Sequence, residues 1–371
     1  MHGEVVQGFS HDRFAALRDV FATSLASGAD LGASCCITLE GETVVDLWGG
    51  HMDAARALPW TRDTLVNVYS CTKTMTALVA LLLADRHELD MDAPVAQYWP
   101  EFAQHGKSAV LVRHVLAHSA GLADWDSPMQ VADLYDWETC VARLAAQTPA
   151  WLPGTASGYH SLTQGYLIGE IVRRITGRTI GTFFREEIAR PLNADFHIGL
   201  PASEDDRVAE LVGDGSANAA GEAAGPSSVA LDIRLPGTRA WRAAEIPAAG
   251  GIGNARAMAE IHRILANDGV AAGKRLISVA GCRRAHESHV SGVDRVLGMN
   301  IRFGLGMALG GAMMPGDNTL YWGGYGGSLV IIDPDVRTSF AFAMNRMAAT
   351  TTGDARAFGL AMAMWETLGQ I

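Results

Sequence analysis

The spacing of apolar residues predicts an amphipathic helix near the N-terminus. Apolar side chains there recur at steps of three and four, which places them on one helical face: Phe14, Leu17, Phe21 and Leu25. Gly28 is expected to end this helix. The residues before Phe14 show no such spacing and are expected to form a short polar lead.

Two β-rich runs follow this helix, at residues 34–39 and 43–48. They are separated only by Glu40-Gly41-Glu42. A glycine-containing connection of this length between β-rich runs is typical of a β-hairpin with a tight turn. The two runs are therefore expected to pair as neighbouring strands.

From about residue 67 to the middle 200s, the apolar spacing is mainly helical. The expected helices lie near residues 70–86, 110–118, 164–175 and 181–189. Residues 213–230 are instead dominated by Gly, Ala and Ser. Because this stretch has little to bury, we expect a surface loop or an internal linker there.

The last third of the chain is expected to return to strands after one more helix at residues 255–265. The strands are predicted at 303–309, 320–323, 328–332 and 338–344, before a final amphipathic helix at 354–368. Strands at both ends with helices between them favour an α+β fold (an α/β sandwich). In this fold one antiparallel sheet is built from N- and C-terminal strands and flanked by helices.

We expect a single domain over residues 1–371. Its α/β subdomain would comprise residues 1–66 plus 245–371, and a mainly helical subdomain, residues 67–244, would be inserted between them.

The charge of the chain argues against two classes of partner. Its 371 residues include 29 Lys and Arg against 40 Asp and Glu, which gives a net charge of −11, and no run of basic residues occurs. Such a chain lacks the electrostatic footprint that phosphate backbones and anionic lipids require, so no nucleic-acid or membrane partner is expected. Only three of the basic residues are lysines: Lys73, Lys107 and Lys274.

The five cysteines favour a cytoplasmic protein. They are odd in number and show no Cys-x-x-Cys spacing, so we expect reduced, mostly buried thiols and no zinc knuckle. The N-terminus lacks the basic and apolar segments of a signal peptide. The longest strongly apolar stretch, residues 77–84, is shorter than the roughly 20 residues that span a bilayer.

Ser70 and Lys73 are the first residues suited to covalent chemistry. Ser70 stands where the helix expected at 70–86 begins, and Lys73 projects from the same face one turn later. The helix dipole and burial both disfavour an ammonium there, so a neutral Lys73 can take the hydroxyl proton of Ser70. The alternative is an N-cap serine followed by a solvated lysine.

Tyr159 is the second candidate. It lies in a turn-rich loop, residues 153–161, just ahead of the helix expected at 164–175, and such a loop can point a side chain into a cleft. A phenol near a lysine ammonium ionises more easily and can carry a proton to a leaving group. The alternative is a tyrosine that anchors the loop through its hydroxyl.

The third candidate is Trp322-Gly323-Gly324, at the end of the strand expected at 320–323. Glycines at this position let a ligand approach the backbone closely, so a peptide N–H here can join that of Ser70 in an oxyanion hole. The alternative is a β-bulge or a hairpin turn.

Together, the three segments resemble the serine β-lactamase and penicillin-binding-protein superfamily, whose signature is Ser-x-x-Lys at the start of a helix. Within it, the sequence is most similar to the class C β-lactamase-like carboxylesterases, known as family VIII esterases. The resemblance extends to His118-Ser119-Ala120-Gly121-Leu122, to residues 169–192 and to residues 246–269. It implies a β-lactamase/transpeptidase-like fold.

The resemblance also implies roles for individual residues. Ser70 would be the nucleophile, Lys73 its base and Tyr159 the partner in proton transfer, while the backbone N–H groups of Ser70 and Tyr325 would form the oxyanion hole. The reaction would be two-step acyl transfer through an acyl-enzyme, with water as the second nucleophile and without metal or cofactor.

Two departures from the class C pattern favour a small uncharged ester as substrate. Ser161 replaces the amide of Tyr-x-Asn, which would grip a β-lactam. Trp322, followed by Gly323 and Gly324, replaces Lys-Thr-Gly, so an apolar wall takes the place of a cation suited to a substrate carboxylate. Ser161, Trp322, Gly323 and Gly324 are therefore the expected substrate-binding residues.

Other constellations are weaker. Ser119 lacks the first glycine of the Gly-x-Ser-x-Gly elbow. His114 and His118 are expected to share a helix face at a zinc-like spacing, but Val115 stands where metalloproteases carry Glu, which favours structural histidines.

Three further hypotheses stay open beside the esterase. On the same site the protein can be an acyltransferase, an amidase or a weak β-lactamase. From a different class, it can be a non-catalytic binding or sensor domain.

Overall fold

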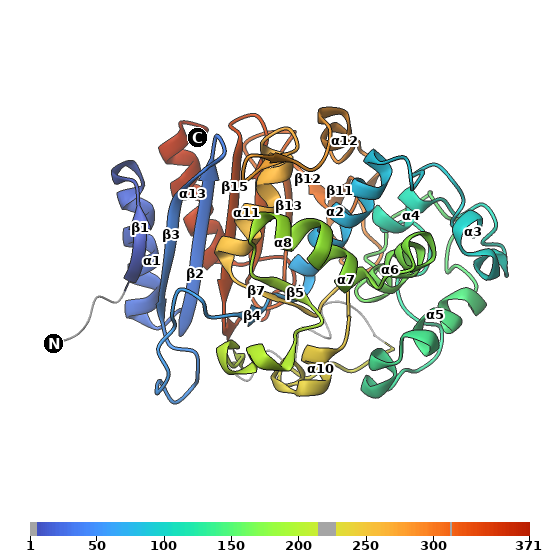
Figure 1. The fold of residues 1–371 in the computed structure, drawn as a ribbon, viewed down its shortest axis with the longest axis horizontal. Coiled ribbons are helices and arrows are strands. Elements are labelled where there is room, and N and C mark those ends of the chain that lie inside the picture. Colours follow the sequence, from blue (N-terminus) through green and yellow to red (C-terminus); the bar gives the residue numbers. More distant parts are fainter. Residues whose placement is uncertain (1–5, 214–227, 312–313) are drawn as a thin grey trace.

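The computed structural model describes residues 6–213, 228–311 and 314–371, and its largest element is a nine-stranded sheet with helices on both faces (Figure 1). All neighbouring strands in this sheet are antiparallel. This arrangement confirms the predicted α+β class. The strand order is β1 (Val6–Ser10), β3 (Glu42–Gly50), β2 (Gly32–Leu39), β15 (Thr338–Met344), β14 (Leu329–Asp333), β13 (Leu320–Gly323), β12 (Ala308–Leu309), β11 (Asn300–Phe303) and β10 (Val290–Val293).

Strands from the two ends of the chain meet in the middle of this sheet, as the sequence predicts. β2 and β15 run antiparallel, with Ala33 opposite Met344 and Leu39 opposite Thr338. β2 also continues into β3 through the predicted hairpin, where Glu40 (φ 50°) and Gly41 (φ 87°) both adopt positive φ. Two successive residues with positive φ form the tight turn that matches the twist of paired strands, and glycine adopts this conformation without strain.

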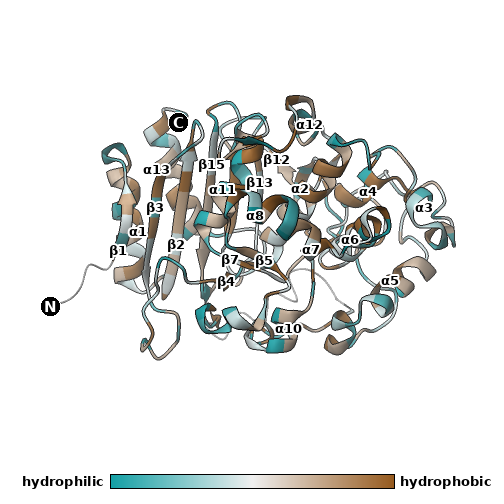
Figure 2. Cartoon of the chain, viewed as in Figure 1, coloured by the Kyte–Doolittle hydropathy of each residue, from teal (hydrophilic) through white to brown (hydrophobic). Residues whose placement is uncertain are grey.

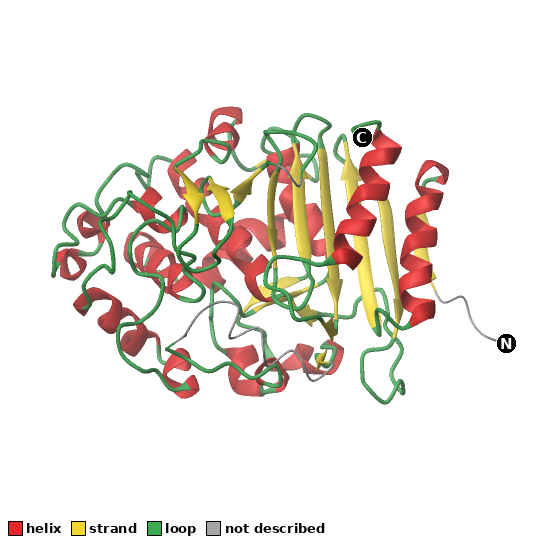
Figure 3. Cartoon of the chain, turned by 180° about the vertical axis from the view of Figure 1, so that it is seen from behind, coloured by secondary structure: helices red, strands yellow, loops and turns green. Residues whose placement is uncertain are grey.

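Helices cover both faces of the sheet. α1 (Ala15–Ser27) and α13 (Ala355–Leu368) pack against each other on one face, which is turned toward the viewer in Figure 3. α11 (Ala255–Ala266) packs on the other face against β2, β14 and β15. α1 ends where the sequence predicts, because Gly28 adopts φ 77° and donates its N–H to the Leu25 carbonyl.

Most of the other helices in the described ranges lie beside the end of the sheet that holds β11 and β12, whereas α8 lies nearer its middle and α10 below (Figure 1). These other helices are α2 (Thr72–Asp85), α3 (Val95–Tyr98), α4 (Val112–Leu116), α5 (Trp137–Ala146), α6 (Thr163–Thr176), α7 (Ile180–Phe184), α8 (Arg190–Leu192), α10 (Arg239–Ala243) and α12 (Val279–Arg284). Short strands form smaller sheets: β4 (Val66–Asn67), β7 (Gly251–Gly253) and β5 (Phe196–Ile198) in one, β6 (Val212–Gly213) with β16 (Arg346–Met347), and β8 (Val270–Ala271) with β9 (Lys274–Arg275). The subdomain boundaries at 66/67 and 244/245 stay a prediction.

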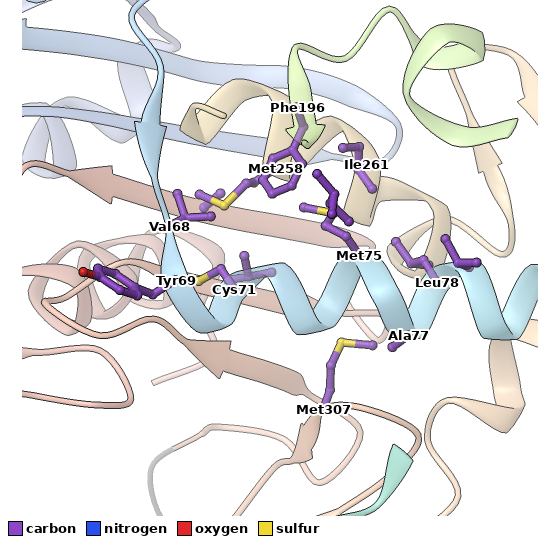
Figure 4. Packing of buried hydrophobic residues seen from close by; sticks show 14 of the residues in the cluster. Val68, Tyr69, Cys71, Met75, Ala77, Leu78, Phe196, Met258, Ile261 and Met307 are labelled. Carbon is purple, nitrogen blue, oxygen red and sulfur yellow. The ribbon is translucent and has the colours of Figure 1, made fainter. Parts of the chain in front are cut away.

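α2 is a buried helix, and both the sheet with α11 and the other helices pack around it. Every residue from Thr72 to Ala84 is buried. Figure 4 shows Met75 directed toward Met258 of α11, while Ala77 faces Met307 on the opposite side. Figure 2 shows the corresponding apolar residues along α2 and the central strands. Because neighbours surround α2 on all sides, the residues at its start are held by packing rather than by helix propensity.

Two predicted boundaries at the ends of the chain are wrong. The expected polar lead contains β1, an edge strand whose Val6 is opposite Gly49 of β3. An edge strand with four of its five residues outside the core leaves little periodic signal. The single strand expected at 303–309 is broken, since Gly306 (φ 82°) lies in the turn between β11 and β12.

The middle of the chain also differs from the prediction in detail. The stretch expected to be mainly helical contains β5, which pairs with β7. The helix expected at 110–118 is shortened to α4, because His118 adopts φ 57° and cannot continue it. The helices expected at 70–86 and 164–175 are confirmed as α2 and α6. Of the Gly/Ala-rich loop at 213–230, residues 214–227 lie outside the described part of the chain.

We expect Leu78→Ala in the middle of α2 to lower the free energy of unfolding by about 2–5 kcal/mol, because a fully buried leucine leaves a cavity when truncated. Urea denaturation followed by circular dichroism measures the effect. Leu58→Ala is the matched control, since Leu58 is 54% exposed, and its cost should stay within about 0.5 kcal/mol. Equal losses in the two variants would contradict a core position for Leu78.

Candidate active site

Ser70 lies in a 3-10 turn, Tyr69–Cys71, that joins β4 to α2. Tyr69 adopts φ 43°, a conformation that non-glycine residues hold only when the surroundings enforce it. The enforcing contacts are visible on Val68, whose N–H donates to the Gly251 carbonyl (2.9 Å) and whose carbonyl accepts from the Ser328 hydroxyl (3.0 Å). β7 and Ser328, the residue before β14, therefore fix the turn that presents Ser70 at the start of α2.

Lys73 follows one helical turn later and is completely buried. Its Nζ lies 3.2 Å from Ser70 Oγ, 2.7 Å from the Ser161 carbonyl oxygen and 2.9 Å from the Ala248 carbonyl oxygen. Within the described residues no carboxylate forms an ion pair with it. Burial lowers the pKa of Lys73 well below its ordinary value, because an ammonium here would lose its hydration without gaining a counter-charge. The alternative of a solvated lysine is therefore wrong.

Tyr159 extends the hydrogen-bond network of Ser70 and Lys73. Its hydroxyl donates to Ser70 Oγ at 2.7 Å, and Lys73 Nζ lies 4.7 Å from the centre of its ring. Burial raises the pKa of Tyr159 above its ordinary value. The easier ionisation expected from a neighbouring ammonium is thus wrong, since the same burial that protonates the phenol also favours a neutral lysine. The loop 153–161 does point Tyr159 at Ser70, as predicted.

Trp322 supports Tyr159 from behind. Its indole N–H donates to the Tyr159 hydroxyl oxygen at 3.3 Å, and its ring packs against those of Phe303 and His118. Only 1% of Trp322 is exposed. The expectation of an apolar wall open to substrate needs correction, because this side chain contacts the phenol and the core instead.

Gly323 and Gly324 serve close packing of the protein's own backbone. A Cβ on Gly324 would lie 2.2 Å from both Ser328 Oγ and the Val68 carbonyl oxygen, and a Cβ on Gly323 would lie 2.2 Å from the Thr352 carbonyl carbon. Only glycine allows β13 to approach the Ser70 turn this closely. The next residue, Tyr325, places its ring 5.3 Å from that of Tyr69, so the turn after β13 lies beside the turn that carries Ser70.

Two backbone contributions to this site leave no signal in the sequence. The backbone carbonyl of Ser161 accepts a hydrogen bond from Lys73, and the identity of the Ser161 side chain does not indicate this role. Ala248, far along the chain, supplies the second carbonyl, and close packing of Pro247 and Ala248 against Gly165 of α6 holds it in place. Carbonyl ligands leave no residue-type signal, so only the fold reveals them.

The histidines near the site are structural. His118 lies beyond the end of α4 and does not share a helix face with His114, contrary to the prediction. His160 donates its backbone N–H to His118 Nδ1, and its own ring bonds to the Gly158 carbonyl and to the Leu122 N–H. Burial lowers the pKa of His160 to about 4, so its ring is neutral at pH 7.

Two other expectations concern metals and thiols. Among residues 6–213, 228–311 and 314–371, no group of three or more His, Cys, Asp and Glu is arranged to hold a metal. All five cysteines are free and buried.

Ser119 is also buried, and its hydroxyl bonds to the His114 carbonyl at 3.3 Å rather than to a base. In the same described ranges, no helix is both long and apolar enough to cross a bilayer.

A half-buried serine in hydrogen-bond contact with a buried lysine and a buried tyrosine, on an antiparallel sheet with an inserted helical part, defines the class of protein. Residues 17–362 match the family model described as Beta-lactamase, and the chain belongs to that family.

Individual proteins are similar along nearly the whole chain. "Esterase/beta-lactamase LipL" of Mycobacterium tuberculosis (strain ATCC 25618 / H37Rv) is 37% identical over 369 residues, covering 93% of this chain and 84% of that protein. A solved family VIII carboxylesterase has a TM-score of 0.92 at 41% identity, covering 98% of this chain and 99% of that one. A penicillin-binding protein homologue from Caulobacter crescentus has a TM-score of 0.91 at 39% identity, with the same coverage. These findings confirm the predicted resemblance and the β-lactamase/transpeptidase-like fold.

The buried His160 predicts how stability depends on pH. Its folded pKa of about 4 lies below the roughly 6.5 of an unfolded histidine. The unfolded chain therefore binds more protons in this window. The contribution of the neutral His160 ring to the free energy of unfolding is fully present above about pH 6.5 and is lost as the pH falls toward 4. We expect urea denaturation at a series of pH values to show this decline and His160→Gln to make it shallower.

A residual slope should remain in that variant, because burial also lowers the pKa of His262 to about 4. The same substitution at the exposed His87 is the control and should leave the slope unchanged. An unaltered slope in His160→Gln would show that this ring does not resist protonation in the folded protein.

Proposed function

We propose that this protein is a serine carboxylesterase that cleaves small, uncharged esters through an acyl-enzyme on Ser70. The observation that carries the proposal is the position of Ser70 Oγ, 2.7 Å from the Tyr159 hydroxyl and 3.2 Å from Lys73 Nζ. The family and the relatives named as esterases support a serine carboxylesterase. The roles of Ser70, Lys73 and Tyr159 in the individual reaction steps are our own proposal.

The hydrogen bonds of Lys73 support its role as the base. A neutral amine has two N–H donors and one lone pair. The carbonyl oxygens of Ser161 and Ala248 accept the two N–H groups, which leaves the lone pair for the hydroxyl proton of Ser70. The amine is thus held in the orientation that general-base catalysis needs.

The reaction then proceeds in two balanced steps. Ser70 Oγ attacks the ester carbonyl carbon while its proton passes to Lys73 Nζ, and the carbonyl oxygen becomes an oxyanion. The oxyanion collapses, the carbon–oxygen bond to the alcohol breaks, and the alcohol leaves with a proton delivered through Tyr159. A water molecule then attacks the acyl-enzyme by the same route and releases the acid and free Ser70.

The backbone N–H groups of Ser70 and Tyr325 would stabilise the oxyanion. The turn after β13 packs against the Ser70 turn through Ser328 and Val68, which places the two peptide groups on neighbouring segments. Donors held by packed backbone stabilise developing charge without having to reorganise.

An uncharged substrate fits the charge of the site. Lys73 is occupied by Ser70 and two carbonyls, and Trp322 offers an indole N–H to Tyr159 where class C β-lactamases carry a cation. A substrate carboxylate would therefore lack a strong ionic partner on β13. On the five free, buried cysteines we also place the protein in the cytoplasm.

Hydrolysis of β-lactams is the second candidate, favoured by the name of the relative LipL, "Esterase/beta-lactamase". A panel of esters assayed beside a chromogenic cephalosporin ranks the two activities. Product analysis with and without an added alcohol separates hydrolysis from acyl transfer, and an amide substrate tests for amidase activity. A probe that labels Ser70 without turnover would favour a binding or sensor domain.

We expect Ser70→Ala to lower kcat for p-nitrophenyl butyrate by about 10³-fold or more, because no acyl-enzyme can form. Initial rates measured by release of p-nitrophenol check this. Ser119→Ala is the matched control, since Ser119 is a buried serine outside the hydrogen-bond network of Ser70, and it should keep its activity. Turnover by Ser70→Ala at the parental rate would remove Ser70 from the mechanism.

The pKa directions predict a broad pH profile. The base works when deprotonated, so kcat/KM should rise with pH through a Lys73 pKa that burial has lowered from its ordinary value. The acid works when protonated, and burial raises the pKa of Tyr159, so the decline at high pH is delayed. Titration of the acid released from ethyl butyrate measures the profile.

Lys73→Arg tests the base directly. A guanidinium stays charged and cannot accept the proton, so we expect about a 10²- to 10⁴-fold loss of kcat. A profile that stays flat into acid pH, or an active Lys73→Arg variant, would contradict the proposed role.

A further inference from the structure

A buried carboxylate outside all the motifs contacts the proposed proton-transfer residue. Asp294 stands directly after β10, in the turn that leads to β11, and is fully buried. Its Oδ1 accepts the backbone N–H of Tyr159 at 3.0 Å. Nothing in the local sequence around Tyr159 or Asp294 indicates this contact, because 135 positions separate the two residues.

The same carboxylate oxygen also fixes its own turn. Oδ1 accepts the N–H groups of Val296 and Leu297, both at 2.9 Å, which is the local pattern by which aspartate stabilises turns. Arg295 in this turn donates its N–H to the Ser157 carbonyl at 2.9 Å. Two hydrogen bonds therefore tie the turn to the loop that carries Tyr159, one on each side of Gly158.

The position of the Tyr159 ring depends on this attachment. The ring belongs to a small apolar cluster built from strands of the same end of the sheet, including Ile301, Phe303 and Trp322. These contacts orient the ring, while Asp294 fixes the peptide from which the side chain extends. A peptide shift of even about 1 Å would carry the phenol away from Ser70 Oγ, and displacements of this size cost about 10²-fold in rate.

The charge of Asp294 acts in the same direction. Burial first, and the Asp294 carboxylate in addition, raise the pKa of Tyr159 and keep the phenol protonated. The other carboxylate oxygen, Oδ2, is buried without a hydrogen-bond partner in the described part of the chain. An asparagine would reproduce the Oδ1 acceptor at the same site, remove the charge and place an amide NH2 group where Oδ2 stands.

We propose that Asp294 is a positioning residue for catalysis, which holds the Tyr159 peptide so that the phenol delivers its proton to the departing alcohol. The proposal rests on the esterase function proposed above. It assigns no direct contact of Asp294 with substrate. It predicts that the loss of Asp294 acts on the leaving-group step through Tyr159 and leaves ester binding largely unchanged.

The test compares two esters that share an acyl group but differ in their leaving group. An alkoxide leaving group needs a proton and a p-nitrophenolate does not. We expect Asp294→Ala to lower kcat for ethyl butyrate roughly 10- to 100-fold, with KM changed less than about threefold. With p-nitrophenyl butyrate the loss of kcat should stay below about fivefold, and Tyr159→Phe should show the same preference between the esters.

A double-mutant comparison separates positioning from general damage. In a Tyr159→Phe background, Asp294→Ala should cause no further loss on ethyl butyrate, because residues that act as a unit are not additive. Asp294→Asn should recover most of the activity, since its amide oxygen accepts the same N–H groups. Asp294→Glu should not, because the added methylene displaces the acceptor. If Asp294→Ala does not fold, the Asn and Glu variants carry the test.

Asp333 provides the matched control. It is the buried last residue of β14 and accepts the N–H groups of Asp335 and Val336 in a similar local pattern, and no hydrogen bond joins it to Tyr159. Asp333→Ala should lower the melting temperature without a preference between the two esters. Equal losses on both esters for Asp294→Ala, or full additivity with Tyr159→Phe, would overturn the positioning role.

The failure of this inference is distinct from that of the esterase proposal. Turnover by Ser70→Ala would overturn both. An inactive Ser70→Ala beside an Asp294→Ala variant with unchanged kcat on ethyl butyrate would overturn only the role of Asp294.

Discussion

The burial of one lysine without a counter-charge is the constraint on which the site depends. Lys73 has no exposed surface, and its partners are a hydroxyl and two backbone carbonyls. An ammonium would lose its hydration in these surroundings at a large cost in free energy, so burial favours the neutral amine, which can accept a proton. The rest of the architecture maintains this burial. α2 is enclosed along its length, and the carbonyls come from the Tyr159 loop and from the segment before β7.

The same burial sets the opposite protonation state on Tyr159. Removing water raises the pKa of a phenol and lowers that of a lysine, so burial favours the neutral form of both groups. A neutral acid and a neutral base on either side of Ser70 give a proton path without separated charge. Trp322 and the turn after β10 secure the acidic side of this path through the indole N–H and the Asp294 carboxylate.

The local spacing of apolar residues was sufficient to predict the helices and strands with strong periodicity. It did not predict elements that form through contacts between distant segments of the chain. The helix before Gly28, the hairpin at Gly41 and the helix after Ser70 each have their apolar spacing or turn residue in one short stretch. β1 and β5 do not, because they are short strands stabilised by their partners β3 and β7. Ser70, Lys73 and Tyr159 were identifiable from side-chain chemistry. The carbonyl of Ala248 and the carboxylate of Asp294 were not, since neither motif nor spacing links them to the site.

The sequence by itself determined the kinds of chemistry available: a hydroxyl and an amine one helical turn apart, a phenol ahead of a helix, and an indole in place of a cation. The first two follow from residue type and helical geometry, and the third from the resemblance to the class C pattern. Only the tertiary structure decided the protonation states, because the pKa of Lys73 and of Tyr159 depends on burial by segments distant in the chain. It also decided what Trp322 does. Trp322 is packed at 1% exposure behind the phenol, and its indole N–H bonds to Tyr159. Beside it, Gly324 approaches Val68 at a distance that only glycine permits, so contacts between distant segments decided this part of the site.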